Sequence, residues 1–333
     1  MAAAGDPYVA RLDEALRFLR EHDDFLIVSH VQPDGDAISS TIAVRWLLDR
    51  LGKRSLMINE GRVPPRLAFL PYAGEIVNYG GRKPERRFRA VVAVDCADFS
   101  RIGLVSELFD EPCALLNIDH HPTNDAFGTV NLLRHDAAAT AEILFDLIEH
   151  AGLAIDAEAA TVIYTGLLTD TGGFRYSNTS PHVMAAASKL LAAGADAHRL
   201  ADRLLERMTV SQLRILQRGL ARLEFTEDGR VGWLYIEPKD LEETGASGED
   251  LEGLVNYARN IDGVEVGLLF KGMEDGTVKV SFRSAGKADV AAIAQRFGGG
   301  GHIRAAGCRL AMPLDEAMRL VVDTVRRALD SMP

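Results

Sequence analysis

A histidine and two aspartates follow an apolar run near the start of the chain. The segment HVQPDGD places His30, Asp34 and Asp36 within seven positions, with Pro33 and Gly35 between them. Imidazole nitrogens and carboxylate oxygens carry protons and bind divalent cations. We expect Pro33 and Gly35 to let the chain turn sharply here. A turn with an aspartate cap that opens the next helix is the structural alternative.

Aspartate and histidine also occur at three later element ends. These positions are Asp95 after residues 90–94, Asp119, His120 and His121 after residues 114–118, and Asp170 after a predicted helix. Each one alone has a structural explanation, such as a cap or a turn. Side chains just past the carboxyl ends of parallel strands line one crevice. We therefore expect one cluster made of His30, Asp34, Asp36, Asp95, His120 and Asp170.

Four carboxylates in one pocket must be neutralised. Two like charges about 4 Å apart repel by roughly 4 kcal/mol at an effective dielectric of about 20. Either the carboxyl pKa values rise, or divalent cations bind between them. The donor set contains nitrogen and oxygen but no sulfur. It suits Mn²⁺ or Mg²⁺, with Fe²⁺, Co²⁺ and Zn²⁺ as competitors.

The elements that would position this cluster predict an α/β fold with a parallel sheet. Short apolar runs alternate with helical patterns in the first half. The expected strands are residues 25–29, 55–59, 90–94 and 114–118, and the expected helices include residues 141–149, 158–168 and 183–193. Residues 196–223 read as one continuous charged helix. We predict a metal-binding domain at 1–195, a helical connector at 196–223 and a second domain at 224–333, and the family resemblance given below implies that the first is catalytic and the second binds substrate.

The last third of the chain predicts a smaller α+β domain. Its expected elements are a strand pair around 231–236, a helix at 249–261, strands at 264–271 and 277–283 joined by an Asp-Gly turn, a further helix before the glycine run, a strand at 303–312 and a closing helix. The segment FGGGGHIRAAG lies between the last two strands. A glycine run allows close backbone approach and exposes amide donors, although a plain flexible turn is the alternative.

Composition narrows the class of protein. The chain has 333 residues, 47% of them hydrophobic, and a net charge of -11, which argues against broad binding to long duplex DNA. Residues 279–309 carry six basic side chains against Asp289 alone, a local balance of +5. This pattern suits a small or short polyanionic substrate. We expect neither an export signal nor a membrane segment, and three free cysteines, so we place the protein in the cytoplasm.

These motifs resemble the DHH phosphoesterase superfamily. H-x-x-P-D-x-D, an aspartate that closes a strand, D-H-H and D-T-G-G-F are similar to its four signatures, and SFRS with GGGGHIRAAG resembles its DHHA1 domain. The two-domain layout is similar to that of NrnA-type enzymes. The resemblance implies hydrolysis of short oligoribonucleotides from one end to mononucleotides, and removal of a phosphate from 3'-phosphoadenosine 5'-phosphate (pAp). The alternatives are a cyclic-dinucleotide or linear-dinucleotide phosphodiesterase (c-di-AMP or pApA) and a non-catalytic nucleotide sensor.

The resemblance also implies a role for each site residue. One cation would be held by His30, Asp34 and Asp95, and a second by Asp36, Asp95, His120 and Asp170, so that Asp95 bridges the two. His121 would face the substrate phosphate, and Asp119 would orient the neighbouring histidines. The implied substrate-binding residues are His121, Arg101, Arg283, Ser284, Gly299, Gly300, Gly301, His302 and Arg304.

The same resemblance implies cofactors and partners. Two divalent cations are expected, Mn²⁺ first, with Mg²⁺ or Co²⁺ as the other choices. Short single-stranded RNA or DNA and pAp are the expected substrates, and a homodimer formed through the first domain is implied.

Overall fold

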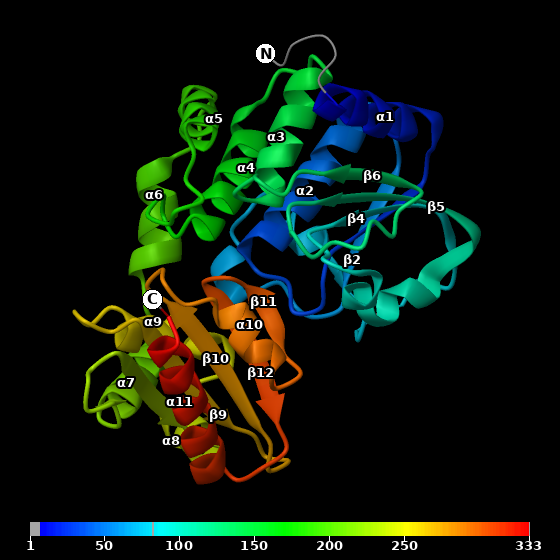
Figure 1. Ribbon diagram of the computed structural model, residues 1–333. Helices are drawn as coiled ribbons and strands as arrows, with labels where there is room; N and C mark the ends of the chain where they lie inside the picture. Colours follow the sequence, from blue (N-terminus) through cyan, green and yellow to red (C-terminus); the bar gives the residue numbers. More distant parts are fainter. Residues whose placement is uncertain (1–6, 82, 333) are drawn as a thin grey trace. The chain divides into compact units, whose positions relative to one another are not determined.

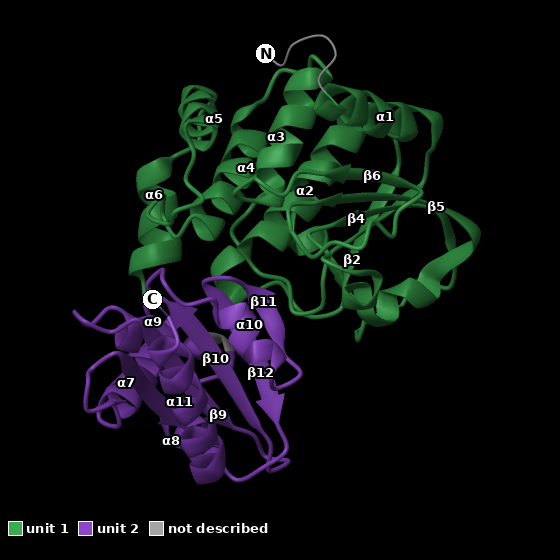
Figure 2. Ribbon diagram, viewed as in Figure 1, with its two compact units in different colours: residues 1–207 green, residues 208–333 purple. Residues whose placement is uncertain are grey.

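The chain forms two compact units. A computed structural model describes residues 7–81 and 83–332 and divides the chain into unit 1, residues 1–207, and unit 2, residues 208–333 (Figure 2). The division falls inside the segment predicted as a connector.

The segment predicted as one continuous helix consists of separate pieces, so that prediction was wrong. Helix α6 (Ala197–Ala201) leads into one π-helical stretch, η4 (Asp202–Glu206), and helix α7 (Val210–Leu220) begins after a break. The side chain of Thr209 accepts a hydrogen bond from the Gln212 amide at 2.9 Å, which starts a new helix at this point. The charged composition did not reveal this cap.

Unit 1 contains a six-stranded sheet in which all neighbouring strands are parallel, as predicted. The order is β3-β2-β1-β4-β5-β6, and Figure 1 labels β2, β4, β5 and β6 of this sheet. The strands are β1 (Phe25–Val28), β2 (Ser55–Asn59), β3 (Val77–Asn78), β4 (Phe88–Val94), β5 (Phe109–Asp119) and β6 (Val130–Leu133). The four predicted strands correspond to β1, β2, β4 and β5. The short outer strands β3 and β6 were missed.

Both faces of this sheet are covered, which explains why its strands are continuously apolar. Phe25 and Ile27 pack on one face with the helices, whereas Leu26 and Val28 pack on the other with residues of η3. The helices are α1 (Pro7–Glu21), α2 (Gly35–Arg50), α3 (Thr140–His150), α4 (Ala157–Asp170) and α5 (Pro181–Ala192), with 3₁₀ segments η1 (Pro65–Leu67), η2 (Ala73–Glu75) and η3 (Phe99–Leu108). Among the described residues, no helix combines the length and the apolar character needed to span a membrane.

Unit 2 is the predicted α+β unit, built on a mixed sheet of order β11-β12-β10-β9-β8-β7. Strands β8 and β9 are parallel, and the other neighbours are antiparallel. The strands are β7 (Glu224–Phe225), β8 (Val231–Ile236), β9 (Val266–Gly272), β10 (Val278–Ser284), β11 (Gly300–His302) and β12 (Ala305–Leu310). The predicted Asp-Gly turn joins β9 to β10, with the Gly276 amide donating to the Met273 carbonyl at 3.0 Å.

The helices of unit 2 differ from prediction in two places: the helix at 238–244 was not predicted, and the helix expected over 249–261 is interrupted. They are α8 (Pro238–Thr244), η5 (Glu249–Leu251), α9 (Leu254–Arg259), α10 (Val290–Gln295) and α11 (Leu314–Asp330). The single helix predicted over 249–261 was wrong. Gly253, at φ 77°, interrupts it and leaves η5 and α9 as separate turns.

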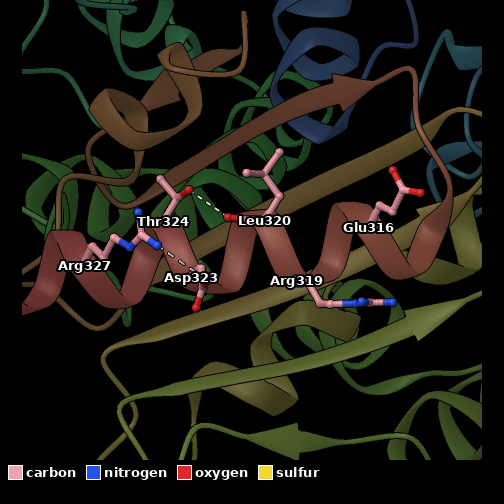
Figure 3. Close-up of a pocket in the computed structure, with 6 residues that line it drawn as sticks. All are labelled: Glu316, Arg319, Leu320, Asp323, Thr324 and Arg327. Atoms are coloured by element: carbon pink, nitrogen blue, oxygen red, sulfur yellow. Dashed lines mark hydrogen bonds and ion pairs between the residues drawn. The ribbon is translucent and has the colours of Figure 1, made fainter.

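A shallow pocket on unit 2 lies along the closing helix. All six of its lining residues belong to α11 (Figure 3): Glu316, Arg319, Leu320, Asp323, Thr324 and Arg327. Thr324 donates to the Leu320 carbonyl at 2.7 Å, and Arg327 lies 3.8 Å from Asp323. These polar groups interact along one amphipathic helix, and the pocket holds none of the residues that the sequence singled out.

Candidate metal centre

The chain turns sharply after β1, but not in the way that the sequence suggested. Gln32 supplies the left-handed residue at φ 56°. Asp34 then caps α2, its Oδ1 accepting from the amides of Asp36 and Ala37 at 3.1 Å each. Gly35 is the first residue of that helix. A Cβ at Gly35 would lie 2.5 Å from the Thr169 side chain, so glycine lets the start of α2 approach the end of α4.

The neighbouring strands bring the other groups to the same edge of the sheet. The strand order changes direction at β1 and β4, and ligands of open α/β sheets bind at the carboxyl ends of the strands at such a point. His30 follows β1, Asp95 follows β4, and Asp119 ends β5. Asp95 has φ 58°, a strained backbone conformation of the kind that occurs at functional sites.

The six predicted ligands come together. Three groups have donor atoms within 4.8 Å of one another: His30 with Asp34 and Asp95; Asp36 with His120 and Asp170; and Asp95 with His120 and His121. His30 Nε2 lies 3.5 Å from Asp95 Oδ2, and His120 Nε2 lies 3.6 Å from Asp95 Oδ1. The two oxygens of Asp95 therefore face different histidines.

Burial makes this collection of charges costly without a counterion. Asp36 is fully buried, and burial raises its pKa well above the ordinary value, with the charges of Asp95 and Asp34 raising it further. Burial also acts to raise the pKa of Asp95, but the hydrogen bond and charge of His30 outweigh it and hold that pKa below its usual range. Burial alone would lower the pKa of His30, yet Asp34 and Asp95 raise it to about 10. Protons therefore occupy the site when cations do not.

The donor geometry fits divalent cations. His30 Nδ1 is 2.9 Å from the Val31 carbonyl, and His120 Nδ1 is 3.2 Å from the Ala137 carbonyl. A carbonyl only accepts, so each Nδ1 carries a proton, and each Nε2 faces the carboxylates and is the atom that a cation would bind in place of a proton. The Nε2–carboxylate distances of 3.5 to 3.8 Å lie at or beyond the upper limit for a hydrogen bond. Nitrogen and oxygen donors arranged in this way could hold metal ions.

Asp119 and His121 form a pair beside the cluster. Asp119 is fully buried, and its Oδ1 lies 2.8 Å from His121 Nδ1. Asn124 Nδ2 donates to the other oxygen of Asp119 at 2.7 Å and to the Cys96 carbonyl at 2.8 Å. Burial tends to lower the pKa of His121, but its hydrogen bond to Asp119 and the charge of Asp95 raise it overall. The pair presents a hydrogen-bonded imidazole at the edge of the candidate site.

Sequence reasoning missed three residues that contact the cluster. Asn124 lies four residues beyond His120, and its only signal was a turn-forming sequence. Thr140 follows three alanines and donates its hydroxyl to Asp95 Oδ1 at 2.9 Å. Asn178 donates to the Asp170 carbonyl at 3.1 Å. No sequence motif distinguished Thr140 or Asn178, because both act across distances in the chain that only the fold closes.

Arg101 lies in unit 1 at the margin of the site. Its carbonyl accepts from the Val31 amide at 2.8 Å, so η3 supports the segment that carries His30. The Arg101 side chain is exposed. Its proposed contact with substrate stays a prediction.

The residues predicted to bind substrate in unit 2 lie at one end of β10 and in the β11–β12 hairpin. Ser284 is buried, and its hydroxyl donates to Glu265 at 3.0 Å, an internal contact. Arg283 precedes it on β10, and the Ser284 amide donates to the Arg304 carbonyl at 3.0 Å. Gly300, Gly301 and His302 form strand β11 and are exposed.

The glycine run has a packing role within this hairpin. A Cβ at Gly299 would lie 2.2 Å from the Gly307 carbonyl oxygen, so only glycine fits against β12 there. Gly300 has open space around it. A Cβ at Gly301 would lie 2.5 Å from the Ala305 carbonyl oxygen, so close packing explains both Gly299 and Gly301, whereas Gly300 is exposed and has room for a ligand.

Comparison with known proteins agrees with the motifs and the fold. The N-terminal domain model of the DHH family matches residues 24–167, and the DHHA1 domain model matches residues 230–331. The chain is similar to the bifunctional oligoribonuclease and PAP phosphatase NrnA of Thermus thermophilus, with 38% identity over 91% of this chain and 89% of that protein. It is 28% identical to the Bacillus subtilis protein of the same name, over 93% of this chain and 96% of that one.

A solved structure shares the fold. The crystal structure of an exopolyphosphatase-related protein from Bacteroides fragilis matches with a TM-score of 0.89 and 27% identity, covering 96% of each chain. The family models, the high identity to NrnA of Thermus thermophilus and the clustered motif residues agree. The chain belongs to the DHH family and carries that family's DHHA1 domain.

Proposed function

We propose that this protein is a metal-dependent phosphoesterase that hydrolyses short oligoribonucleotides to mononucleotides and removes a phosphate from pAp. The observation that carries the proposal is the convergence of His30, Asp34, Asp36, Asp95, His120 and Asp170 at one edge of the sheet. Relatives named as bifunctional oligoribonuclease and PAP phosphatase support this substrate class. They favour it over a dinucleotide phosphodiesterase and over a non-catalytic sensor.

The cluster supports a two-cation arrangement. We propose that His30, Asp34 and Asp95 hold one ion and that Asp36, Asp95, His120 and Asp170 hold the other, with Asp95 shared. Two such ions would lower the pKa of a bound water and neutralise phosphoryl oxygens. Mn²⁺ is the proposed ion, and Mg²⁺ and Co²⁺ are the alternatives. The donor set contains no sulfur ligand, in agreement with this choice.

The residues of the chain then orient the substrate. His121, held by Asp119 at 2.8 Å, would hydrogen-bond a phosphoryl oxygen and would supply a proton to the departing ribose oxygen. No serine or cysteine nucleophile is required, because water is the attacking group.

Unit 2 supplies the surface that we propose binds the end of the oligonucleotide. Arg283 and Arg304, with the exposed residues Gly300 and Gly301, would bind a terminal phosphate. A guanidinium binds phosphate through two parallel hydrogen bonds, which lysine would not reproduce. We propose residues 1–195 as the catalytic domain and 224–333 as the substrate-binding domain. The cytoplasm is the proposed location, and a homodimer is proposed on family resemblance alone.

The test is hydrolysis by wild type and Asp95→Ala with pAp, a linear dinucleotide, a longer RNA and cyclic di-AMP, each with Mn²⁺ or a chelator. Asp95→Ala should lose nearly all turnover, because both ions share Asp95. Asp110→Ala is the matched control, since Asp110 pairs with Arg89 at 2.9 Å near the start of β5, at the other end of the strand from Asp119. Wild-type preference for cyclic di-AMP, or substantial activity of Asp95→Ala, would overturn the proposal.

A further inference from the structure

One short segment contacts three of the proposed ligands directly. We call residues 137–141, which lead into α3, the brace. The Thr140 amide donates to Asp36 Oδ2 at 2.6 Å, and the Ala141 amide donates to Asp36 Oδ1 at 3.0 Å. Asp36 lies more than a hundred positions earlier in the chain and is fully buried. The brace therefore fixes both oxygens of a carboxylate that cannot reach bulk water.

The Thr140 hydroxyl contacts one oxygen of the shared aspartate. It donates to Asp95 Oδ1 at 2.9 Å. This oxygen faces His120 at 3.6 Å, whereas Oδ2 faces His30 at 3.5 Å. Thr140 is itself fully buried. Its hydroxyl thus restrains the half of Asp95 that belongs to the second proposed ion position.

The remaining ligands of that position depend on the same segment. The Ala137 carbonyl lies 3.2 Å from His120 Nδ1, which directs His120 Nε2 toward the site. Asn178 Nδ2 joins the Ala138 carbonyl, at 3.2 Å, to the Asp170 carbonyl, at 3.1 Å. All four ligands of the second position are therefore linked to the brace, directly or through Asn178.

A buried ion pair anchors the brace. Glu142 is fully buried, and its Oε2 accepts from the Ala138 amide at 2.6 Å. Its other oxygen pairs with Arg134 at 3.0 Å. A buried carboxylate paired with an arginine and bonded to a backbone amide is a rigid support.

The first proposed position is held in a different way. His30 Nδ1 lies 2.9 Å from the Val31 carbonyl, and Asp34 accepts from amides of its own helix. Within the described part of the chain, no hydrogen bond joins the brace to either side chain. We propose, on the basis of the two-ion function above, that Thr140 is a positioning residue that selectively supports the ion position of Asp36, His120 and Asp170.

The test is titration of the metal-free protein with Mn²⁺ alone, followed by calorimetry and by the electron paramagnetic resonance signal of free Mn²⁺. Thr140→Val keeps the shape of the side chain but removes the hydroxyl. One of the two binding steps should weaken by about 10- to 100-fold, the usual cost of losing a group that orients a metal ligand. Thr140→Ser should restore it. Thr41→Val is the matched control, because Thr41 is buried in α2 and donates to Ala37 at 2.8 Å.

Two backgrounds identify the weakened step. In His30→Ala only the second position remains, and Thr140→Val should weaken it. In Asp170→Ala the first position remains, and Thr140→Val should weaken it much less, because Thr140 contacts only the Asp95 oxygen that faces His120. Equal weakening in both backgrounds, or no change in either, would overturn the inference. A wild-type protein that binds no Mn²⁺ pair would instead overturn the proposed function.

A further variant keeps the inference testable if Thr140→Val does not fold. Asn178 is exposed, so Asn178→Ala leaves the core unchanged. It should weaken the same step as Thr140→Val, although less strongly, because it removes a link to a backbone carbonyl. An Asn178→Ala protein that weakens the His30 step instead would contradict the proposal.

Discussion

Replacing Asp119 by asparagine should reverse the hydrogen bond that orients His121. Asn124 cannot rotate its amide freely, since its Nδ2 donates to the Cys96 carbonyl at 2.8 Å and its Oδ1 accepts from Asn117 at 2.9 Å. It therefore continues to donate toward position 119. In Asp119→Asn the new amide must turn its oxygen to Asn124 and its NH₂ group to His121 Nδ1. That nitrogen can no longer donate, so His121 takes the other tautomer.

The magnitude follows from the bond that is lost. His121 Nδ1 and Asp119 Oδ1 are 2.8 Å apart, a short hydrogen bond to a charged group. Such bonds contribute about 1.5 to 3 kcal/mol. At about 1.36 kcal/mol for each factor of ten, kcat should fall about 10- to 150-fold. KM should change much less, because the Arg283 and Arg304 surface is unaltered.

The assay is steady-state hydrolysis of pAp at saturating Mn²⁺, with nitrogen NMR of labelled histidine to read the tautomer of His121. The double variant Asp119→Asn with Asn124→Asp provides the control. The carboxylate introduced by Asn124→Asp would accept a hydrogen bond from the NH₂ group of the new asparagine at position 119. The amide oxygen of that asparagine would then face His121 Nδ1 again, so kcat should recover in part. Recovery stays partial because the bond to the Cys96 carbonyl is lost. Wild-type kcat, or an unchanged tautomer in Asp119→Asn, would refute the reasoning.

Three other perturbations should have measurable effects. A Cβ at Gly166 would lie 2.7 Å from Asp36 Oδ1, so Gly166→Ala should destabilise by about 1 to 3 kcal/mol in urea unfolding and weaken Mn²⁺ binding. Gly219→Ala in α7, whose Cβ would meet only leucine methyl groups at 3.3 Å, should be nearly neutral. In unit 2, burial alone would raise the pKa of Asp240, but its hydrogen bonds from Arg222 lower the pKa overall. Because the pKa of Asp240 is lower in the folded protein, its ionised form stabilises the fold at pH values above the unfolded pKa, and this stabilisation is lost as the pH falls. Asp240→Asn should therefore lower the unfolding free energy by about 1.5 to 3 kcal/mol at pH 7 and by less below about pH 4. If Mn²⁺ is present at a hundred times its Kd, a chelator should lower the unfolding free energy by about 2.7 kcal/mol for each bound ion that it removes. Equal unfolding curves with and without Mn²⁺ would contradict this.

The sequence revealed those site residues that directly follow a recognisable strand. Asp95 and His120 come directly after apolar strands, and strand ends in a parallel sheet share one edge, so their approach could be predicted. Thr140 could not be predicted, because its partners Asp36 and Asp95 reach it only when α3 packs against α2 and β5. The fold also adds a contact that the motif did not reveal: the Ser284 hydroxyl donates to Glu265, and its contact with substrate stays a prediction.

The fold was predictable to a similar extent. Continuous apolar runs identified the central strands, since both sheet faces are buried. The edge strand β6 contains Asn131, and β3 is only two residues long, so neither carries a clear apolar run. The helix break before Thr209 depends on a capping bond, which composition does not reveal.

The proposed ligands span residues 30 to 170 and come from the ends of β1, β4, β5 and α4 and from the start of α2. No shorter stretch of the polypeptide contains the full set. A chain emerging from the ribosome would thus stay inert toward RNA until α4 docks. Binding of the two proposed metal ions would then show that unit 1 has finished folding.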